Sequence, residues 1–322
     1  MTEEIKRICN FYNKFKKKYD HNSMWTETLT KPCHKIFNIF SNNRYEKCRY
    51  LLENIGKYPG VTEGYDPCGS TKNFYSYLTK STEETILKML KEMNIEPVYL
   101  DNNELNMENI FTILDDKLGF RVEFPEYFDY ENRYDILTSR GKISHRNIFA
   151  LYYVYNISKH VEDVKNTSVL EIGPGSGRTA YWAHNFGFKK YTIIDIVNSN
   201  IIQAHYNFCS LGSKNVCLSG EEDTGQFLKI INNTEYSTLN EKFDIIANFD
   251  GLTEYGIETA QKYFDRFHLL SNKFISINHK YNSYSVSDLY KSKENIKIKI
   301  KEECNYRSDH KLLGYVKEVI LF

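Results

Sequence analysis

The chain has 322 residues, and its 42 lysines and arginines balance its 42 aspartates and glutamates, so it has no net positive field with which to attract nucleic acid or an anionic membrane. It has no apolar run of about 18 residues and no apolar core of signal-peptide type near its start, so we expect a cytoplasmic protein without a membrane span. Its seven cysteines are scattered without a Cys-x-x-Cys pair, which argues against a disulfide framework and against a zinc site.

Residues 1–140 lack regular alternation of strands and helices. Mixed helical patterns over Lys6–Tyr19 and Lys35–Ile55, and a clear amphipathic pattern over Glu83–Met93, predict a mainly helical region that would act as a cap or substrate domain. Between them, the glycine- and proline-rich stretch Lys57–Thr71 predicts a long loop. Such a loop either covers a ligand site or merely connects two helices at the surface.

A second domain is predicted over residues 141–322. It begins with an apolar helix over Ser144–His160, in which Ser144 is suited to cap the first turn and one face would lie on a sheet. The helix leads directly into the first predicted strand, so it should flank that strand in space.

The next stretch organises the rest of the chain. A buried strand over Ser168–Ile172 ends in the tight loop Gly173–Gly177, and a helix is predicted over Arg178–Phe186. A second buried strand, Tyr191–Ile194, then ends on the carboxylate of Asp195. A strand, a glycine loop, a helix and a strand that ends on an acid form half of a nucleotide-binding unit.

Strands and helices continue to alternate up to the end of the chain. Further helices are predicted over Ser199–Leu211, Gly225–Ile231 and Gly256–Leu270, further strands over Val216–Leu218, Phe243–Phe249 and Lys273–Ile277, and two closing strands over Ile296–Lys301 and Tyr315–Phe322. This order predicts an α/β fold with a Rossmann-like, doubly wound sheet.

The glycine spacing bears on which nucleotide binds. Dinucleotide folds use Gly-x-Gly-x-x-Gly, whereas this loop reads Gly-x-Gly-x-Gly and continues with Arg178, which disfavours an NAD-dependent oxidoreductase. The segment EIGPGSG resembles motif I of the class I S-adenosylmethionine (AdoMet)-dependent methyltransferases. That resemblance implies AdoMet as the cofactor and a seven-stranded sheet closed by an antiparallel hairpin.

The resemblance also implies which residues hold the cofactor. Glu171 would face the ammonium group, Asp195 the ribose, Glu222 or Asp223 the adenine amine, and Arg146 the carboxylate. A surface arginine and an acidic helix start are the alternatives for Arg146 and for the acidic pair. The complete predicted set is Arg146, Glu171, Gly173, Pro174, Gly175, Gly177, Asp195, Ile196, Glu222, Asp223 and Asn248.

A narrower resemblance covers about Arg140 to His279. The blocks LEIGPGSGR, YTIIDI with Gln203-x-x-Tyr206 after it, FDIIANFDGLTEY and KFISINH are similar to a bacterial family of sugar O-methyltransferases. This implies an acceptor hydroxyl on a sugar or nucleotide-sugar. Another small-molecule hydroxyl or amine, or a non-catalytic AdoMet-binding partner subunit, are the alternatives.

Methylation of a sugar hydroxyl needs a group that takes the proton as the bond forms, because the hydroxyl is too weak an acid to ionise beforehand. His279, at the end of the fifth parallel strand, is the predicted base, with Glu254 or Asp250 orienting it. The alternatives are a structural histidine and a divalent metal held by the same three residues, although their spacing is not diagnostic of a metal site.

Overall fold

The computed structural model describes residues 2–16, 36–42, 44–58, 72–128, 136–293, 295–304 and 314–322, so most of the predicted Lys57–Thr71 loop lies outside the described residues. The α-helices in these ranges are α1 (Thr2–Phe15), α3 (Tyr45–Glu53), α4 (Lys72–Glu92), α5 (Met107–Leu118), α6 (His145–Ser158), α7 (Arg178–Asn185), α8 (Val197–Leu211) and α9 (Ile257–Leu270). None of these helices is both long enough and apolar enough to span a bilayer.

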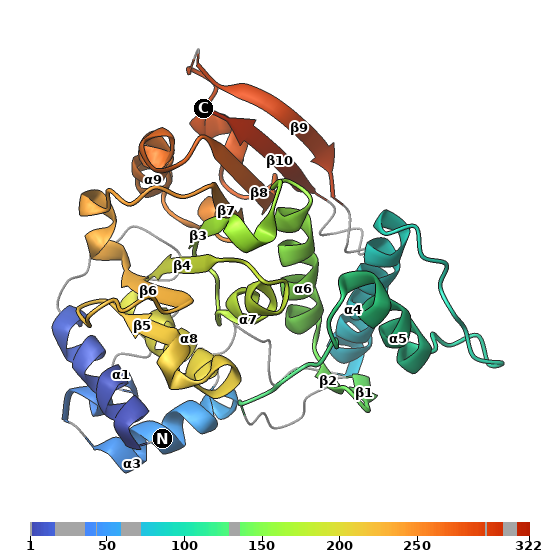
Figure 1. The fold of residues 1–322 in the computed structure, drawn as a ribbon, viewed down its shortest axis with the longest axis horizontal. Helices are drawn as coiled ribbons and strands as arrows, with labels where there is room; N and C mark the ends of the chain where they lie inside the picture. Colours follow the sequence, from blue (N-terminus) through green and yellow to red (C-terminus); the bar gives the residue numbers. More distant parts are fainter. Residues whose placement is uncertain are drawn as a thin grey trace.

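The centre of the molecule is a sheet whose eight described strands have the order β5-β6-β4-β3-β7-β8-β10-β9 (Figure 1). Neighbouring strands are parallel from β5 to β8, and β10 runs antiparallel to both β8 and β9. The strands are β3 (Ser168–Ile172), β4 (Lys190–Asp195), β5 (Val216–Leu218), β6 (Leu228–Asn232), β7 (Ile245–Phe249), β8 (Lys273–His279), β9 (Lys297–Glu303) and β10 (Tyr315–Leu321). The predicted α/β class, with a Rossmann-like sheet closed by an antiparallel hairpin, is therefore confirmed, although eight strands replace the expected seven.

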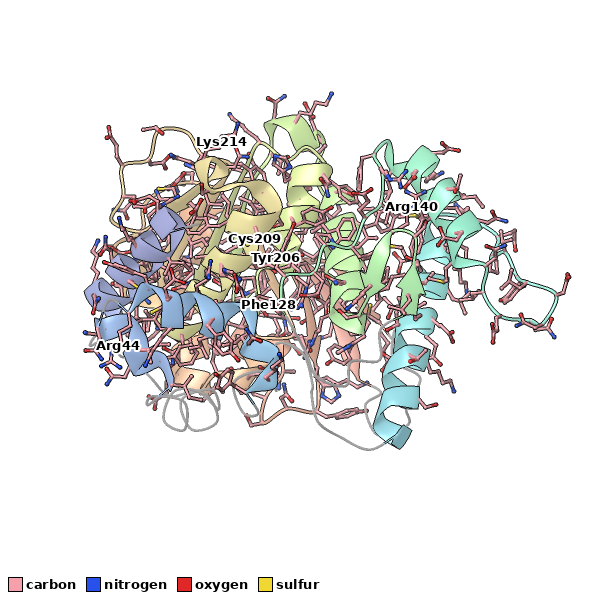
Figure 2. All side chains as sticks on the ribbon, turned by 90° about the horizontal axis from the view of Figure 1, so that it is seen from below. Arg44, Phe128, Arg140, Tyr206, Cys209 and Lys214 are labelled. Carbon is pink, nitrogen blue, oxygen red and sulfur yellow. The ribbon has the colours of Figure 1, made fainter. Side chains whose placement is uncertain are left out.

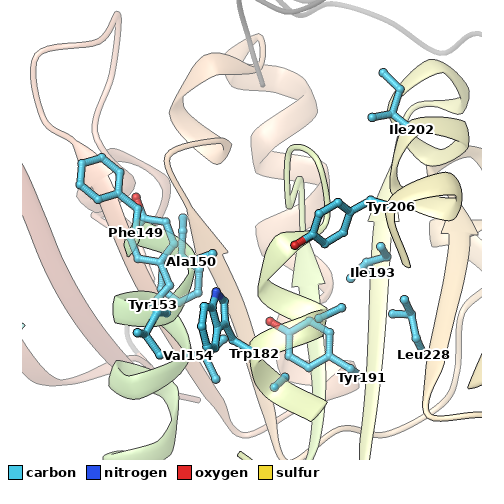
Figure 3. Close-up of a cluster of buried hydrophobic side chains, with 14 of the residues drawn as sticks. Phe149, Ala150, Tyr153, Val154, Trp182, Tyr191, Ile193, Ile202, Tyr206 and Leu228 are labelled. Atoms are coloured by element: carbon cyan, nitrogen blue, oxygen red, sulfur yellow. The ribbon is translucent and has the colours of Figure 1, made fainter. Parts of the chain in front are cut away.

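Helices cover both faces of this sheet. Successive residues of a strand point to opposite faces, so in β3 Val169 joins the core under α6, α7 and α8, whereas Leu170 joins the core under α9. Figure 3 shows part of the first of these cores, to which α6 contributes Tyr153, α7 contributes Trp182 and β4 contributes Tyr191. Both cores are aromatic-rich and enclose the strands that carry the predicted site.

One predicted element is wrong. Residues Gly225–Ile231 were expected to form a helix, but β6 (Leu228–Asn232) occupies this stretch and pairs with β4 over its whole length. A short stretch in which apolar residues alternate irregularly with polar ones fits a buried strand and a helix equally well, so its neighbours decide between them. As a result β5, the expected third strand, is displaced to the edge of the sheet, where it pairs only with β6 among the described strands.

The N-terminal region lies against the predicted α/β domain on two sides. Helix α1 packs on α8 and α4 packs on α6 (Figure 1). Between them, the segment 120–128 crosses α7, where Phe124 contacts the Trp182 ring edge-on at 5.3 Å. At the end of this segment Phe128 lies beside Tyr206 of α8, with ring centroids 5.7 Å apart (Figure 2). The boundary near residue 140 stays a prediction, and one buried apolar cluster runs across it.

Two elements of this region escaped prediction. Helix α5 begins at Met107 after a cap in which the Asn106 side chain accepts a hydrogen bond from Asn109 N, and it ends at the left-handed Gly119. A small antiparallel hairpin of β1 (Ile136–Thr138) and β2 (Gly141–Ile143) precedes α6. The region is thus mainly helical, as expected, with a hairpin at its end.

Candidate functional site

A pocket opens where β3, β4 and β7 end, at the carboxyl edge of the sheet. Its walls come from the loop after β3, from α6 and from the turn after β7. Its lining includes Arg146, Phe149, Tyr153, Glu171, Gly173, Pro174, Gly175, Ser176, Asp195, Phe249, Asp250, Glu254 and Tyr255. This edge is where ligands bind in open α/β sheets.

The glycine loop has a left-handed backbone at Gly173, Gly175 and Gly177, with φ of 66°, 61° and 79°. A side chain at Gly173 is excluded by packing, since its Cβ would stand 2.5 Å from the hydroxyl oxygen of Tyr255. A Cβ at Gly175 would instead meet nothing within 4 Å. The loop therefore presents bare backbone at Gly175 to open space, as a ligand lying against the loop requires.

Glu171 is buried at the floor of the pocket, with 1% of its surface exposed. Its Oε2 accepts hydrogen bonds from the hydroxyls of Thr179 at 2.5 Å and Tyr191 at 3.0 Å. Burial raises the pKa of the Glu171 carboxyl to about 7, and the nearby charge of Asp195 adds to the rise. Ionisation of Glu171 is thus costly, and a cationic ligand would relieve that cost.

Asp195 ends β4 beside the glycine loop. Its Oδ1 accepts from Ile196 N at 2.7 Å and its Oδ2 accepts from Gln203 Nε2 at 2.8 Å. Gln203 Nε2 also donates to Gly175 O at 2.8 Å, so it ties the acid to the loop. Burial raises the pKa of the Asp195 carboxyl to about 7 despite these bonds. Gln203 was noted in the sequence only as part of a family block, and its function as a link depends on contacts that the sequence does not show.

The other wall of the pocket is formed by the turn after β7. Asp250 has a left-handed backbone with φ of 52°, which is unusual for a residue other than glycine. Its Oδ1 accepts a hydrogen bond from the Tyr315 hydroxyl at 2.8 Å, and Arg146 Nη1 lies 3.4 Å from Oδ2. Glu254 lines the same wall. The structure therefore brings Arg146, Asp250 and Glu254 into one pocket with Glu171 and Asp195.

An aromatic pair completes that wall. The rings of Tyr153, from α6, and Phe249, from β7, are stacked at 4.4 Å with an angle of 8° between their planes. Both residues line the pocket. Aromatic faces near a cation attract it by about 0.5–2 kcal/mol, so the pair suits a positively charged ligand.

His279 lies outside this pocket. It lines a neighbouring cavity together with Ser285 and Lys301, and its Nδ1 accepts from Tyr281 N at 3.2 Å. Its ring packs edge-on against Tyr315 at 5.1 Å, so it is one ring removed from Asp250. The structure does not bring His279 together with Asp250 and Glu254 around one cavity, as the sequence had predicted. The Tyr315 side chain contacts both His279 and Asp250, and His279 lines the neighbouring cavity.

Three further predicted residues lie outside the pocket lining. Asn248 is wholly buried and donates to Ile172 O at 2.7 Å while accepting from Leu252 N at 2.9 Å, so it joins β3 to the turn after β7 without lining the pocket. The Ile196 side chain packs against the larger core and is likewise outside the lining. Gly177 is the N-cap of α7, and its carbonyl oxygen accepts a hydrogen bond from Asn207 Nδ2 of α8 at 3.2 Å.

The acidic pair after β5 is at the wrong end of the sheet for the adenine. Asp223 pairs with Lys190 at 3.3 Å and Lys229 at 3.4 Å, and these lysines stand near the amino ends of β4 and β6. Glu222 is exposed. The correction follows from β6: because β6 and not β5 neighbours β4, the residue level with Asp195 is Asn232.

The sequence left open a divalent metal held by Asp250, Glu254 and His279. Within the described ranges, no group of three or more His, Cys, Asp or Glu side chains is arranged to hold a metal ion.

Comparisons with known proteins give distant similarities. No protein-family model matches the chain. The poly(ribitol-phosphate) α-N-acetylglucosaminyltransferase of Staphylococcus aureus (strain COL) is 24% identical over 255 residues, which are 67% of this chain and 47% of that protein. The chain thus spans about half the length of this relative.

Among solved structures, the magnesium protoporphyrin IX methyltransferase of Synechocystis PCC 6803 with bound SAM is 13% identical and covers 55% of this chain and 79% of its own, with a TM-score of 0.41. The ribosomal protein L11 methylase of Lactobacillus delbrueckii subsp. bulgaricus is 16% identical and covers 54% and 77%, with a TM-score of 0.38. The curated relative is named as an N-acetylglucosaminyltransferase, whereas the two solved structures are named as a methyltransferase and a methylase.

Proposed function

We propose that this chain is an AdoMet-dependent methyltransferase that methylates a hydroxyl group of a small molecule. One observation carries the proposal: Glu171, the open backbone at Gly175 and Asp195 line a single pocket, opposite Asp250 and Glu254. This is the arrangement that the motif I resemblance implies for a cofactor and an acceptor placed face to face.

The chain's residues fit the cofactor in charge and in shape. Glu171 would receive the ammonium group, Asp195 the ribose hydroxyls, and the bare backbone at Gly175 the methionine part. Both acids are held at a raised pKa of about 7 by burial, so they gain from a ligand that brings a positive charge or hydroxyl donors. Arg146 is the proposed partner of the cofactor carboxylate.

When bound, AdoMet supplies an electrophilic methyl group on a positively charged sulfur. The protein then has to align the acceptor oxygen with that methyl in a dry pocket and to take one proton. We assign the proton to Asp250, because it lines the pocket and is held by Tyr315 and Arg146. The Asp250 carboxylate would take up the hydroxyl proton of the acceptor as its oxygen receives the methyl group, while Glu171, Asp195 and Arg146 would hold the methyl donor.

We propose that the acceptor hydroxyl belongs to a sugar or a nucleotide-sugar. A sugar or nucleotide-sugar hydroxyl is supported by the family resemblance and by the name of the curated relative, whose substrate contains hydroxyl-rich ribitol units. Such an acceptor would be processed in the cytoplasm. No binding partner other than this small molecule is proposed.

Two measurements test the function. Calorimetry should show binding of S-adenosylhomocysteine, the product form of the cofactor, and no comparable binding of NAD. Incubation with methyl-labelled AdoMet and a panel of sugars, nucleotide-sugars and amines should then transfer label to a hydroxyl compound. A folded protein that prefers NAD, or that binds the cofactor yet labels amines only, would overturn the proposal in its first or second part.

A further inference from the structure

Asp250 is held by three separate parts of the fold. Its amide donates to Ile277 O in β8 at 2.9 Å, and the next amide, of Gly251, donates to Asn278 Oδ1 at 3.1 Å. Its carboxylate meets Arg146 from α6 and Tyr315 from β10. A non-glycine residue with φ of 52° persists only where the surroundings enforce it, and such sites cluster where function needs a fixed side chain.

Tyr315 is the most distant of these contributors in sequence. It is the first residue of β10, lies opposite His279 in the register with β8, and has only 4% of its surface exposed. Its ring fills the space beside His279, while its hydroxyl reaches Asp250 Oδ1. A phenylalanine would fill the same space against His279, so packing alone does not account for the hydroxyl.

We propose that Tyr315 is a positioning residue for methyl transfer, and that its hydroxyl fixes the Asp250 carboxylate in the orientation that receives the acceptor's proton. The inference rests on the proposed function. Tyr315 itself does not line the pocket, so it acts through Asp250. The closing hairpin, which otherwise completes the sheet, would thereby contribute to the reaction.

The geometry explains why one hydroxyl matters. A carboxylate has about four lone-pair directions, and the contacts with Tyr315 and Arg146 use one on each oxygen. Held at both oxygens, the group resists rotation about its terminal torsion, which is broad when unrestrained. Of these two contacts the one with Arg146 is the longer, at 3.4 Å against 2.8 Å, so the Tyr315 hydroxyl makes the stronger hydrogen bond.

The test compares Tyr315→Phe with Tyr290→Phe in the full chain. Tyr290 is a matched control, because it is also buried and its hydroxyl donates a hydrogen bond of 2.6 Å to a carboxylate oxygen, Glu318 Oε1. Neither Tyr290 nor Glu318 lines the pocket. For Tyr315→Phe we expect unchanged S-adenosylhomocysteine affinity and a loss of roughly 10- to 100-fold in kcat, as a misplaced reacting group produces. The loss should fall on kcat while the KM for the acceptor stays close to that of the wild type, because the carboxylate is misplaced in an otherwise intact pocket. Tyr290→Phe should keep the wild-type kcat and KM.

A double-mutant cycle completes the test. In an Asp250→Asn background, Tyr315→Phe should cause little further loss of kcat, since both changes affect one unit. Wild-type kcat in Tyr315→Phe, or additive losses in the cycle, would refute the positioning function while leaving methyl transfer by the wild type intact. Absence of methyl transfer by the wild type would instead refute the proposed function, and the melting temperatures of the cycle would then still report whether Tyr315 and Asp250 are coupled.

Discussion

Replacing Glu171 tests whether its buried charge lowers the stability of the folded protein and favours a cationic ligand in the pocket. The substitution Glu171→Gln keeps the size of the side chain and an oxygen that can accept from Thr179 and Tyr191. It removes only the buried charge. We therefore expect the variant to be more stable than the wild type without cofactor, and to lose cofactor binding.

The magnitude follows from the pKa of Glu171. Burial raises it from 4.5 to about 7, so between these pH values the folded protein keeps a proton that the unfolded chain releases. Stability is therefore lost as the pH rises through this window, by up to about 3 kcal/mol at pH 8 and by less than about 1 kcal/mol at pH 5. Glu171→Gln should recover most of this difference at pH 8 and little at pH 5.

Urea unfolding at pH 8 and pH 5, in the presence and absence of S-adenosylhomocysteine, measures both effects. Glu162→Gln is the control, because Glu162 is exposed and should respond at neither pH. The wild type should gain stability from the ligand and Glu171→Gln should gain almost none. A variant that is less stable than the wild type at pH 8, or that binds the ligand normally, would refute the assignment of Glu171 to a cationic group.

Three further predictions concern the same pocket. Burial raises the pKa of Glu171 and of Asp195 to about 7, so the affinity for S-adenosylhomocysteine, measured by calorimetry, should rise from pH 6 to pH 8. The rise should be up to about tenfold per pH unit for each proton released, and an affinity independent of pH would contradict this. Asp195→Ala should abolish or strongly weaken that binding, whereas Asp223→Ala, which alters a surface ion pair, should leave it unchanged. Asp250→Asn should lower kcat by about 10²- to 10⁴-fold in a labelled-methyl assay, whereas His279→Ala should lower it less than about tenfold. A larger loss of kcat in His279→Ala than in Asp250→Asn would instead identify His279 as the base.

The elements around the glycine loop could be predicted from the sequence because their signals are local. The run Ser168–Ile172 is followed directly by Gly173, and the structure has β3 over the same residues. Helix α6 begins at His145 after a cap in which the Ser144 hydroxyl accepts from Asn147 N, as the sequence predicted. Neighbouring residues alone determine such features, since hydrogen bonds in a cap and the burial of a strand depend on a few consecutive side chains.

Contacts between distant segments were decided by the tertiary structure. Leu228–Asn232 became a strand because β4 offered it a partner, and that pairing moved the acidic residues Glu222 and Asp223 away from the pocket. The Tyr315 hydroxyl meets Asp250 across 65 positions of the chain. No periodicity records such a meeting, because it depends on which strands become neighbours in the sheet and on the side to which each residue points, and both are settled only when the whole sheet assembles.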